Sequence, residues 1–218
     1  MSTPKSLKID FVSDVVCPWC AIGLVSLETA LKRLDGVVQA EIHVQPFQLN
    51  PDMPPEGEDI IEHLSRKYGM APEQVRANQA AIRERGQQVG FEFSQEGRSR
   101  TWNTFDAHRL LHWAGLQGRE VDLKHALLTA YFTEGLNPGD HDVLLGKVAA
   151  LGLDVEAARA VLDSDAHADD VRERLRFYAS QGISSVPSVI VNDRHLIQGG
   201  QPPEVFEQAL RQLAGAEA

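Results

Sequence analysis

Alternating apolar and polar residues at the start of the chain predict a strand that leads directly into a helix. Residues 7–16 alternate as a half-buried strand does. Residues 18–35 then carry apolar side chains at helical spacing, and Asp35-Gly36 ends that helix. Residues 38–49 alternate again. A strand, a helix and a second strand form a βαβ unit, so we expect a parallel strand pair with a right-handed crossover.

The middle of the chain has a helical pattern. A proline-rich stretch at residues 50–57 separates it from the second strand. Apolar residues then recur at helical spacing, and we expect Asn103 to be the N-cap of one of these helices. The helices are predicted at residues 60–68, 72–89, from 103 to about 115, 120–134, 140–151 and 155–163. We therefore predict an all-helical insertion domain over residues 58–164.

The last third of the chain returns to a mixed pattern. Residues 165–181 predict a helix, residues 188–191 and 195–198 a β-hairpin, and residues 202–213 a final amphipathic helix. Without the insertion, the order is βαβ followed by αββα, which is the order of the thioredoxin fold. The sequence therefore predicts the α/β class, with residues 1–57 plus 165–218 forming a thioredoxin-like domain.

Charge and composition exclude several classes of function. The 218 residues include 21 Lys and Arg against 31 Asp and Glu, a net charge of −10. An acidic chain is not attracted to phosphate backbones, so we expect no nucleic-acid partner. The sequence has no apolar run that could cross a membrane and no secretion signal at its start, so we expect a cytoplasmic protein without a membrane partner. In the cytoplasm, a lone cysteine pair is more often catalytic than structural.

The only two cysteines lie in Cys17-Pro18-Trp19-Cys20, at the predicted junction of strand and helix. With Cys17 as the N-cap and Pro18 as the first helical residue, free backbone N–H groups and the helix dipole favour a Cys17 thiolate. The pKa of Cys17 should therefore fall below that of a free cysteine. Cys20 lies one turn further on the same face. The pattern indicates a nucleophile with its resolving thiol, as in thiol–disulfide exchange.

The cysteine pair and the histidines have other possible interpretations. An inert cysteine pair is not favoured at this junction, and a structural zinc site needs four ligands where only one pair exists, so we predict no metal site. His108 and His112 have metal-ligand spacing on a helix, but no third ligand is evident in the sequence. We interpret them as a structural or surface pair. Asn103 either binds a thiol ligand or only caps its helix.

Val186-Pro187 is the second candidate element of the site, directly before the third strand of the predicted domain. In this order of elements it falls where the thioredoxin fold places its cis-proline loop, beside the dithiol. That resemblance implies a cis Val–Pro bond. The backbone before such a proline can pair with an extended peptide like an added strand.

The chain resembles the DsbA-like branch of the thioredoxin-fold oxidoreductases, in particular the FrnE-like group. The similar segments are residues 10–20, 103–110, 131–132, 182–188 and 199–202. The resemblance implies a thiol:disulfide oxidoreductase that acts on protein thiols and disulfides or on glutathione as a co-substrate, with no bound cofactor beyond the Cys17–Cys20 disulfide. Trp19 stands where periplasmic DsbA oxidants carry histidine, so their strong oxidising power is not implied. The second cysteine pair of some FrnE-like proteins is absent.

Two alternatives remain open. Kappa-class glutathione transferases and 2-hydroxychromene-2-carboxylate isomerases resemble the insertion, including Asn103-Thr104, but usually carry serine at the position of Cys17. A non-enzymatic client-binding holdase would use Trp102, Phe105 and Trp113 on a concave surface, although Phe105 and Trp113 also suit a helix core. The sequence does not predict the direction of redox flux, the physiological substrate or the oligomeric state.

Overall fold

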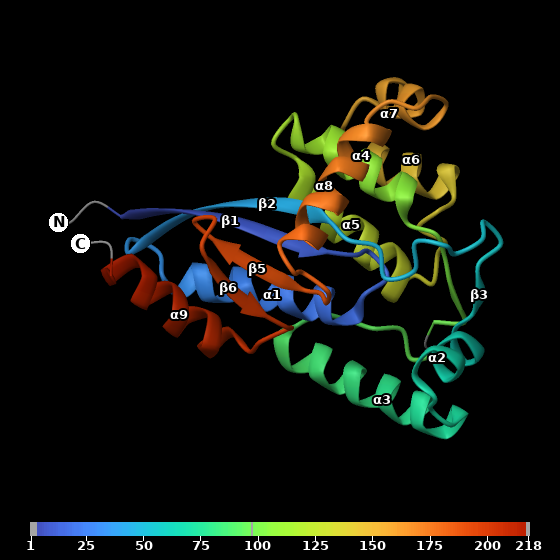
Figure 1. Ribbon diagram of the computed structural model, residues 1–218, viewed down its shortest axis with the longest axis horizontal. Helices are drawn as coiled ribbons and strands as arrows, with labels where there is room; N and C mark the ends of the chain where they lie inside the picture. Colours follow the sequence, from blue (N-terminus) through green and yellow to red (C-terminus); the bar gives the residue numbers. More distant parts are fainter. Residues whose placement is uncertain (1–3, 97, 217–218) are drawn as a thin grey trace.

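A mixed four-stranded sheet forms the centre of the protein. The computed structural model describes residues 4–96 and 98–216, and within them the sheet has the order β2-β1-β5-β6 (Figure 1). Its strands are β1 (Lys5–Ser13), β2 (Val38–Pro46), β5 (Ser188–Val191) and β6 (His195–Gln198). β1 is parallel to β2 and antiparallel to β5, which pairs antiparallel with β6. The parallel pair and the hairpin confirm the predicted thioredoxin order.

Helices cover both faces of this sheet. On one side, α1 (Pro18–Arg33) packs along α9 (Pro203–Ala216), and on the other side lie α8 (Ala168–Ser180) and part of the insertion (Figure 1). Most apolar residues of α1 are buried, which explains the helical spacing of its sequence. Gly36 follows α1 with φ +75°, a conformation that glycine adopts at little cost.

The insertion is mainly helical and lies between β2 and α8 in the sequence. Its helices are α2 (Ile60–Tyr68), α3 (Pro72–Val89), α4 (Phe105–Gly115), α5 (Glu120–Phe132), α6 (His141–Ala150) and α7 (Val155–Leu162). Two short strands, β3 (Glu58–Asp59) and β4 (Arg100–Thr101), pair antiparallel within it. The prediction of an all-helical insertion was therefore wrong in this detail, because two-residue strands are too short to show an alternating pattern.

Among the element boundaries that differ from the sequence pattern, three have a clear local reason. β1 ends at Ser13 and not at residue 16, because Asp14 turns the chain and its carboxylate accepts the N–H of Val15. β2 ends at Pro46, which has no N–H to extend the ladder. α8 begins at residue 168, three residues later than predicted, because His167 adopts a left-handed conformation with φ +61°.

One hydrophobic core runs through the sheet and the insertion. Phe11 of β1 and Leu24 of α1 belong to the same buried cluster as Leu110 of α4 and Leu127 of α5. The division into residues 1–57 plus 165–218 and residues 58–164 stays a prediction. Among the described residues, no helix combines the length and the apolar character needed to span a membrane.

Candidate active site

The two cysteines lie at the start of α1, as the sequence predicts. Cys17 is the N-cap with extended backbone, and Pro18 is the first helical residue. Both cysteines are free thiols, and both are buried. Trp19, between them, is 42% exposed and lies next to the pair at the surface. Pro18 fits this position because its fixed φ suits the first turn and its missing N–H leaves no helical bond unmade.

The surroundings shift the pKa values of the two thiols in opposite directions. The Cys20 thiol donates a hydrogen bond to Cys17, and this bond, helped by the backbone N–H groups of Cys20 and Trp19, lowers the pKa of Cys17. Burial and the negative charge of Asp14 act in the opposite direction. Burial raises the pKa of Cys20 well above its usual value, and the hydrogen bond and charge of Cys17 add to that rise. Cys17 is therefore the thiol that ionises first.

A buried carboxylate lies behind the dithiol. Asp14 accepts hydrogen bonds from the backbone N–H groups of Val15 and Leu49, each at 2.8 Å, and from His108 Nε2 at 3.2 Å. Burial alone would raise the pKa of Asp14, but the hydrogen bonds and charge of His108 and the Leu49 N–H outweigh it, so that the pKa is lowered. A permanent negative charge thus lies close to Cys17.

A buried lysine of α5 also interacts electrostatically with the two cysteines and with Asp14. The side chain of Lys124 is fully buried, and its Nζ finds no hydrogen-bond partner among the described residues. Burial lowers the pKa of Lys124, while the charges of Cys20, Asp14 and Cys17 oppose that shift. Neither Asp14 nor Lys124 was predicted from the sequence as a site residue. The available signal was a lysine inside the apolar stripe of a helix, beside Leu123 and one turn before Leu127.

The Val186-Pro187 loop lies against the dithiol. The peptide bond between these residues is cis, as the resemblance implied. The Cys17 thiol donates to the Val186 carbonyl oxygen over an Sγ–O distance of 3.6 Å. Two glycines permit this close packing: a Cβ on Gly23 would lie 3.0 Å from Cγ of Pro187, and a Cβ on Gly200 would lie 2.8 Å from the Trp19 carbonyl oxygen.

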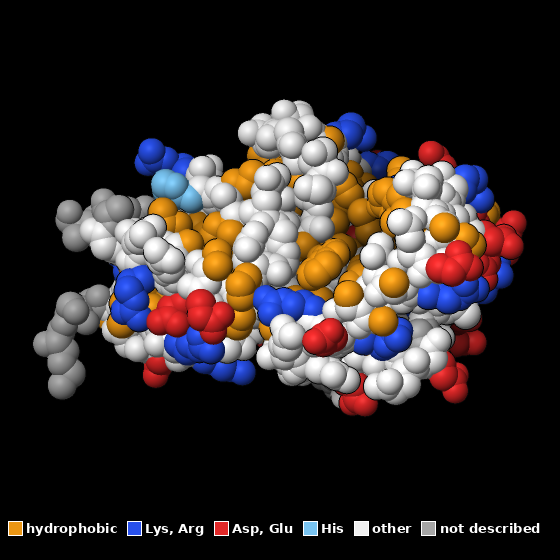
Figure 2. Space-filling view, turned by 90° about the horizontal axis from the view of Figure 1, so that it is seen from below, with side chains coloured by type: hydrophobic (Ala, Val, Ile, Leu, Met, Phe, Trp, Pro, Cys, Tyr) orange, Lys and Arg blue, Asp and Glu red, His pale blue; other side chains and the backbone are white. Residues whose placement is uncertain are grey.

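A groove of about 610 Å³ opens from Cys17 between the Val186 loop and helices α2 and α3. Its apolar wall from the insertion consists of Ile60, Leu64, Tyr68, Met70, Val75 and Ile82. Arg98 also lines it and donates to the Val16 carbonyl oxygen at 3.1 Å, which ties the insertion to the dithiol loop. Figure 2 shows hydrophobic side chains gathered across the hollowed middle of the face that includes α3 and α9.

The remaining candidate residues lie outside this groove. The Asn103 carboxamide donates to the Met53 carbonyl oxygen at 3.0 Å and accepts the Phe105 N–H at 2.9 Å. Asn103 therefore organises the start of α4, although the N-cap itself is Thr104. Trp102, Phe105 and Trp113 do not line the groove, and Trp113 is buried in the core.

The family of the chain follows from its comparison with known proteins. Residues 8–211 match the model of the DSBA-like thioredoxin domain, and the chain belongs to this family of oxidoreductases. It is 28% identical over 206 residues to the uncharacterized protein YwbO of Bacillus subtilis (strain 168), covering 94% of this chain and 96% of YwbO.

Solved structures agree with this assignment. The probable DsbA oxidoreductase SCO1869 from Streptomyces coelicolor superposes with a TM-score of 0.88 at 33% identity, covering 97% of this chain and 91% of that one. The cytosolic disulfide reductase DsbM from Pseudomonas aeruginosa, solved with GSH, superposes with a TM-score of 0.64 at 18% identity, covering 94% and 98%. The second likeness shows the fold alone.

Proposed function

We propose that this protein catalyses thiol–disulfide exchange with Cys17 as the nucleophile and Cys20 as the resolving thiol. The observation that carries the proposal is the opposite displacement of the two pKa values in a pair that opens onto a groove. A lowered pKa supplies thiolate at neutral pH, and a raised one keeps the second thiol protonated until it is needed.

The reaction proceeds in two displacements. The Cys17 thiolate attacks one sulfur of a substrate disulfide, and the other substrate sulfur leaves as a thiolate that takes up a proton. Cys20 then loses its proton and attacks the Cys17 sulfur. This step forms the Cys17–Cys20 disulfide and releases the second substrate sulfur as a thiolate. The substrate disulfide gains two electrons, and the dithiol loses two; the reverse sequence oxidises a substrate dithiol.

The groove suggests where a substrate binds. Cys17, Pro18, Trp19 and Val186 form one end of it, so a substrate sulfur placed there would meet the nucleophile directly. An extended peptide can pair with the backbone before Pro187, and the groove of about 610 Å³ is also open to a small thiol such as glutathione. We therefore propose protein thiols and disulfides or glutathione as substrates. The cytoplasmic location stays a prediction from the sequence.

Active-site variants test the roles of the two thiols. We expect Cys17→Ser to abolish exchange and Cys20→Ser to accumulate mixed disulfides with a model disulfide, detected by mass spectrometry. Ser26→Ala is a matched control, because it removes a buried hydroxyl of α1 that has no hydrogen-bond partner among the described residues. Dithiol-dependent reduction of a protein disulfide by Cys17→Ser would disprove the assignment of the nucleophile.

A redox titration against glutathione distinguishes the alternatives, with Trp19 fluorescence as the reporter. A two-electron midpoint is expected, near −270 mV for a reductase of the thioredoxin type or about −230 to −180 mV for an oxidase or isomerase. If the pair forms no disulfide and Cys17 takes up one glutathione, a glutathione-dependent transferase or isomerase replaces the proposal. Client binding that survives loss of both thiols, without any exchange activity, would instead indicate a holdase.

A further inference from the structure

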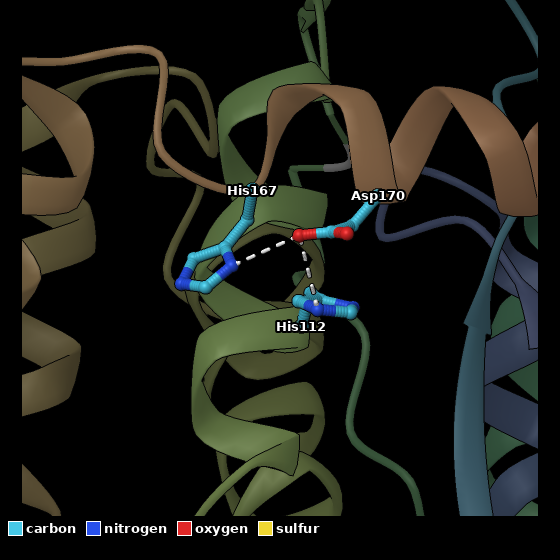
Figure 3. A group of neighbouring side chains, drawn as sticks. All are labelled: His112, His167 and Asp170. Atoms are coloured by element: carbon cyan, nitrogen blue, oxygen red, sulfur yellow. Dashed lines mark hydrogen bonds and ion pairs between the residues drawn. The ribbon is translucent and has the colours of Figure 1, made fainter.

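Two histidines and one carboxylate converge on the side of the protein where α4 meets α8. His112 comes from α4, while His167 is the N-cap of α8 and Asp170 lies in its first turn (Figure 3). One oxygen of Asp170 lies 3.2 Å from His167 Nδ1 and 3.6 Å from His112 Nε2. The two imidazole rings face each other at a tilt of 45°, with their centroids 5.0 Å apart. None of the three side chains lines the dithiol groove.

These separations match those of ligands around a small metal ion. In a tetrahedral zinc site with bonds of about 2.0–2.1 Å, neighbouring ligand atoms lie about 3.4 Å apart. The two distances to the Asp170 oxygen fall close to this value, and one ligand atom from each residue lies within 4.8 Å of the others.

The local backbone presents the ligands together. His167 and Asp170 are three residues apart, so they lie on one face at the first turn of α8. His112 reaches the same point from the last turn of α4. The His112 side chain is 17% exposed. It borders two surface depressions, both also lined by Arg174, and these depressions leave room for a water ligand. Two imidazoles, one carboxylate and an open fourth position are a common ligand set for zinc.

We propose that His112, His167 and Asp170 bind one zinc ion or a similar divalent transition-metal ion, with water as the fourth ligand. The ion connects α4 of the insertion to α8, which returns the chain to the sheet. Its binding energy then adds to the stability of the folded state, since the unfolded chain does not bring residues 112 and 167 together. The rival explanation is a simple ion pair between Asp170 and the histidines.

The test uses the Cys17→Ser/Cys20→Ser protein, because reduced cysteines also bind zinc. Titration calorimetry with zinc sulfate should give one ion per chain, and the melting temperature should rise with zinc concentration. Co²⁺ in the same protein should give the intense visible bands of a four-coordinate site. These readouts do not depend on exchange activity, so they succeed or fail independently of the proposed function.

Ligand variants in the same background locate the ion. His112→Gln, His167→Asn and Asp170→Asn should each weaken zinc binding by at least about tenfold. Asparagine suits position 167 because it tolerates a positive φ. His125→Gln is the matched control, since His125 pairs with Glu28 at 2.8 Å but belongs to no cluster of three ligands among the described residues, and it should bind zinc normally.

Three results would overturn the proposal. The first is a cysteine-free protein that binds no zinc, and the second is zinc binding that the three ligand variants leave unchanged. The third is loss of stability in Asp170→Asn that is the same with and without zinc. That result would assign the cluster to an ion pair that needs no metal.

Discussion

Replacing Asp14 by asparagine should change stability and thiol chemistry in opposite senses. One carboxylate oxygen of Asp14 accepts from the Val15 N–H and His108 Nε2, and the other accepts from the Leu49 N–H. Asparagine keeps only one oxygen as an acceptor. Its amide N–H₂ group replaces the other oxygen and faces a hydrogen-bond donor that then has no acceptor. A buried donor without a partner costs about 1–3 kcal/mol, and a hydrogen bond to a charged group contributes about 1.5–3 kcal/mol.

The stability loss can be estimated from these contacts. At least one of the three bonds is lost and the charge that strengthens another disappears, so we expect the free energy of unfolding to fall by about 2–4 kcal/mol. For a chain of this size, that corresponds to a decrease in melting temperature of roughly 5–15 °C. Urea unfolding and scanning calorimetry measure the two quantities.

The effect on Cys17 has the opposite sign, because the negative charge of Asp14 raises the pKa of Cys17. In Asp14→Asn this contribution is gone, so the pKa of Cys17 should fall further. The pH dependence of alkylation by iodoacetamide measures it. Cys20 contributes little to the alkylation signal, because it is buried and its pKa is high.

Asp10→Asn is the control for the alkylation assay. Asp10 is a second buried carboxylate, in β1, that accepts from Gln45 Nε2 at 2.6 Å and pairs with Lys8. Its charge is not among the causes that displace the pKa of Cys17. An unchanged or higher pKa of Cys17 in Asp14→Asn would refute the reasoning, as would an equal fall in Asp10→Asn.

Two further predictions concern pH and backbone contacts. The folded pKa of Asp14 lies below its ordinary value of 3.8, so its stabilisation is present above that pH and is lost as the pH falls through the lowered pKa. Acid titration of wild-type protein and Asp14→Asn should show this loss only in the wild type. Gly200→Ala places a Cβ 2.8 Å from the Trp19 carbonyl oxygen, so it should destabilise by about 1–3 kcal/mol and slow exchange. Gly146→Ala in α6 meets no atom within 4 Å and should stabilise by up to about 1 kcal/mol; equal effects of the two substitutions would contradict this account.

Much of the fold is predictable because its signals are local. Apolar alternation identifies β1 and β2, helical spacing of apolar residues identifies α1 and α2, and the short connection at Asn192-Asp193 identifies the last hairpin. The exact end of β1 was not predictable, because it depends on the hydrogen bonds of one side chain, Asp14. The pairing of β3 with β4 depends on segments more than 40 residues apart, and each is too short to have a period.

In the candidate site, too, the residues with a local sequence signal were predictable and those brought together by the fold were not. Cys17, Pro18 and Trp19 are neighbours in the sequence, and Val186-Pro187 is located by the order of the elements around it. Of these two segments, Cys17, Pro18, Trp19 and Val186 line the groove. Cys20 lies buried behind Cys17, and Pro187 packs on α1. His108 and His112 looked like one pair, but the structure directs them to different partners. His108 contacts Asp14, while His112 contacts Asp170, which lies 58 positions further along the chain.

The charges around the dithiol come from both parts of the protein. Asp14 follows β1 of the sheet, whereas His108 belongs to α4 and Lys124 to α5 of the insertion. Charges in an apolar interior act more strongly than in water, because fewer solvent dipoles screen them. The position of α4 and α5 around the dithiol, through His108 and Lys124, therefore affects how readily Cys17 ionises. The insertion therefore contributes to the proposed chemistry of the thiols as well as to the wall of the groove.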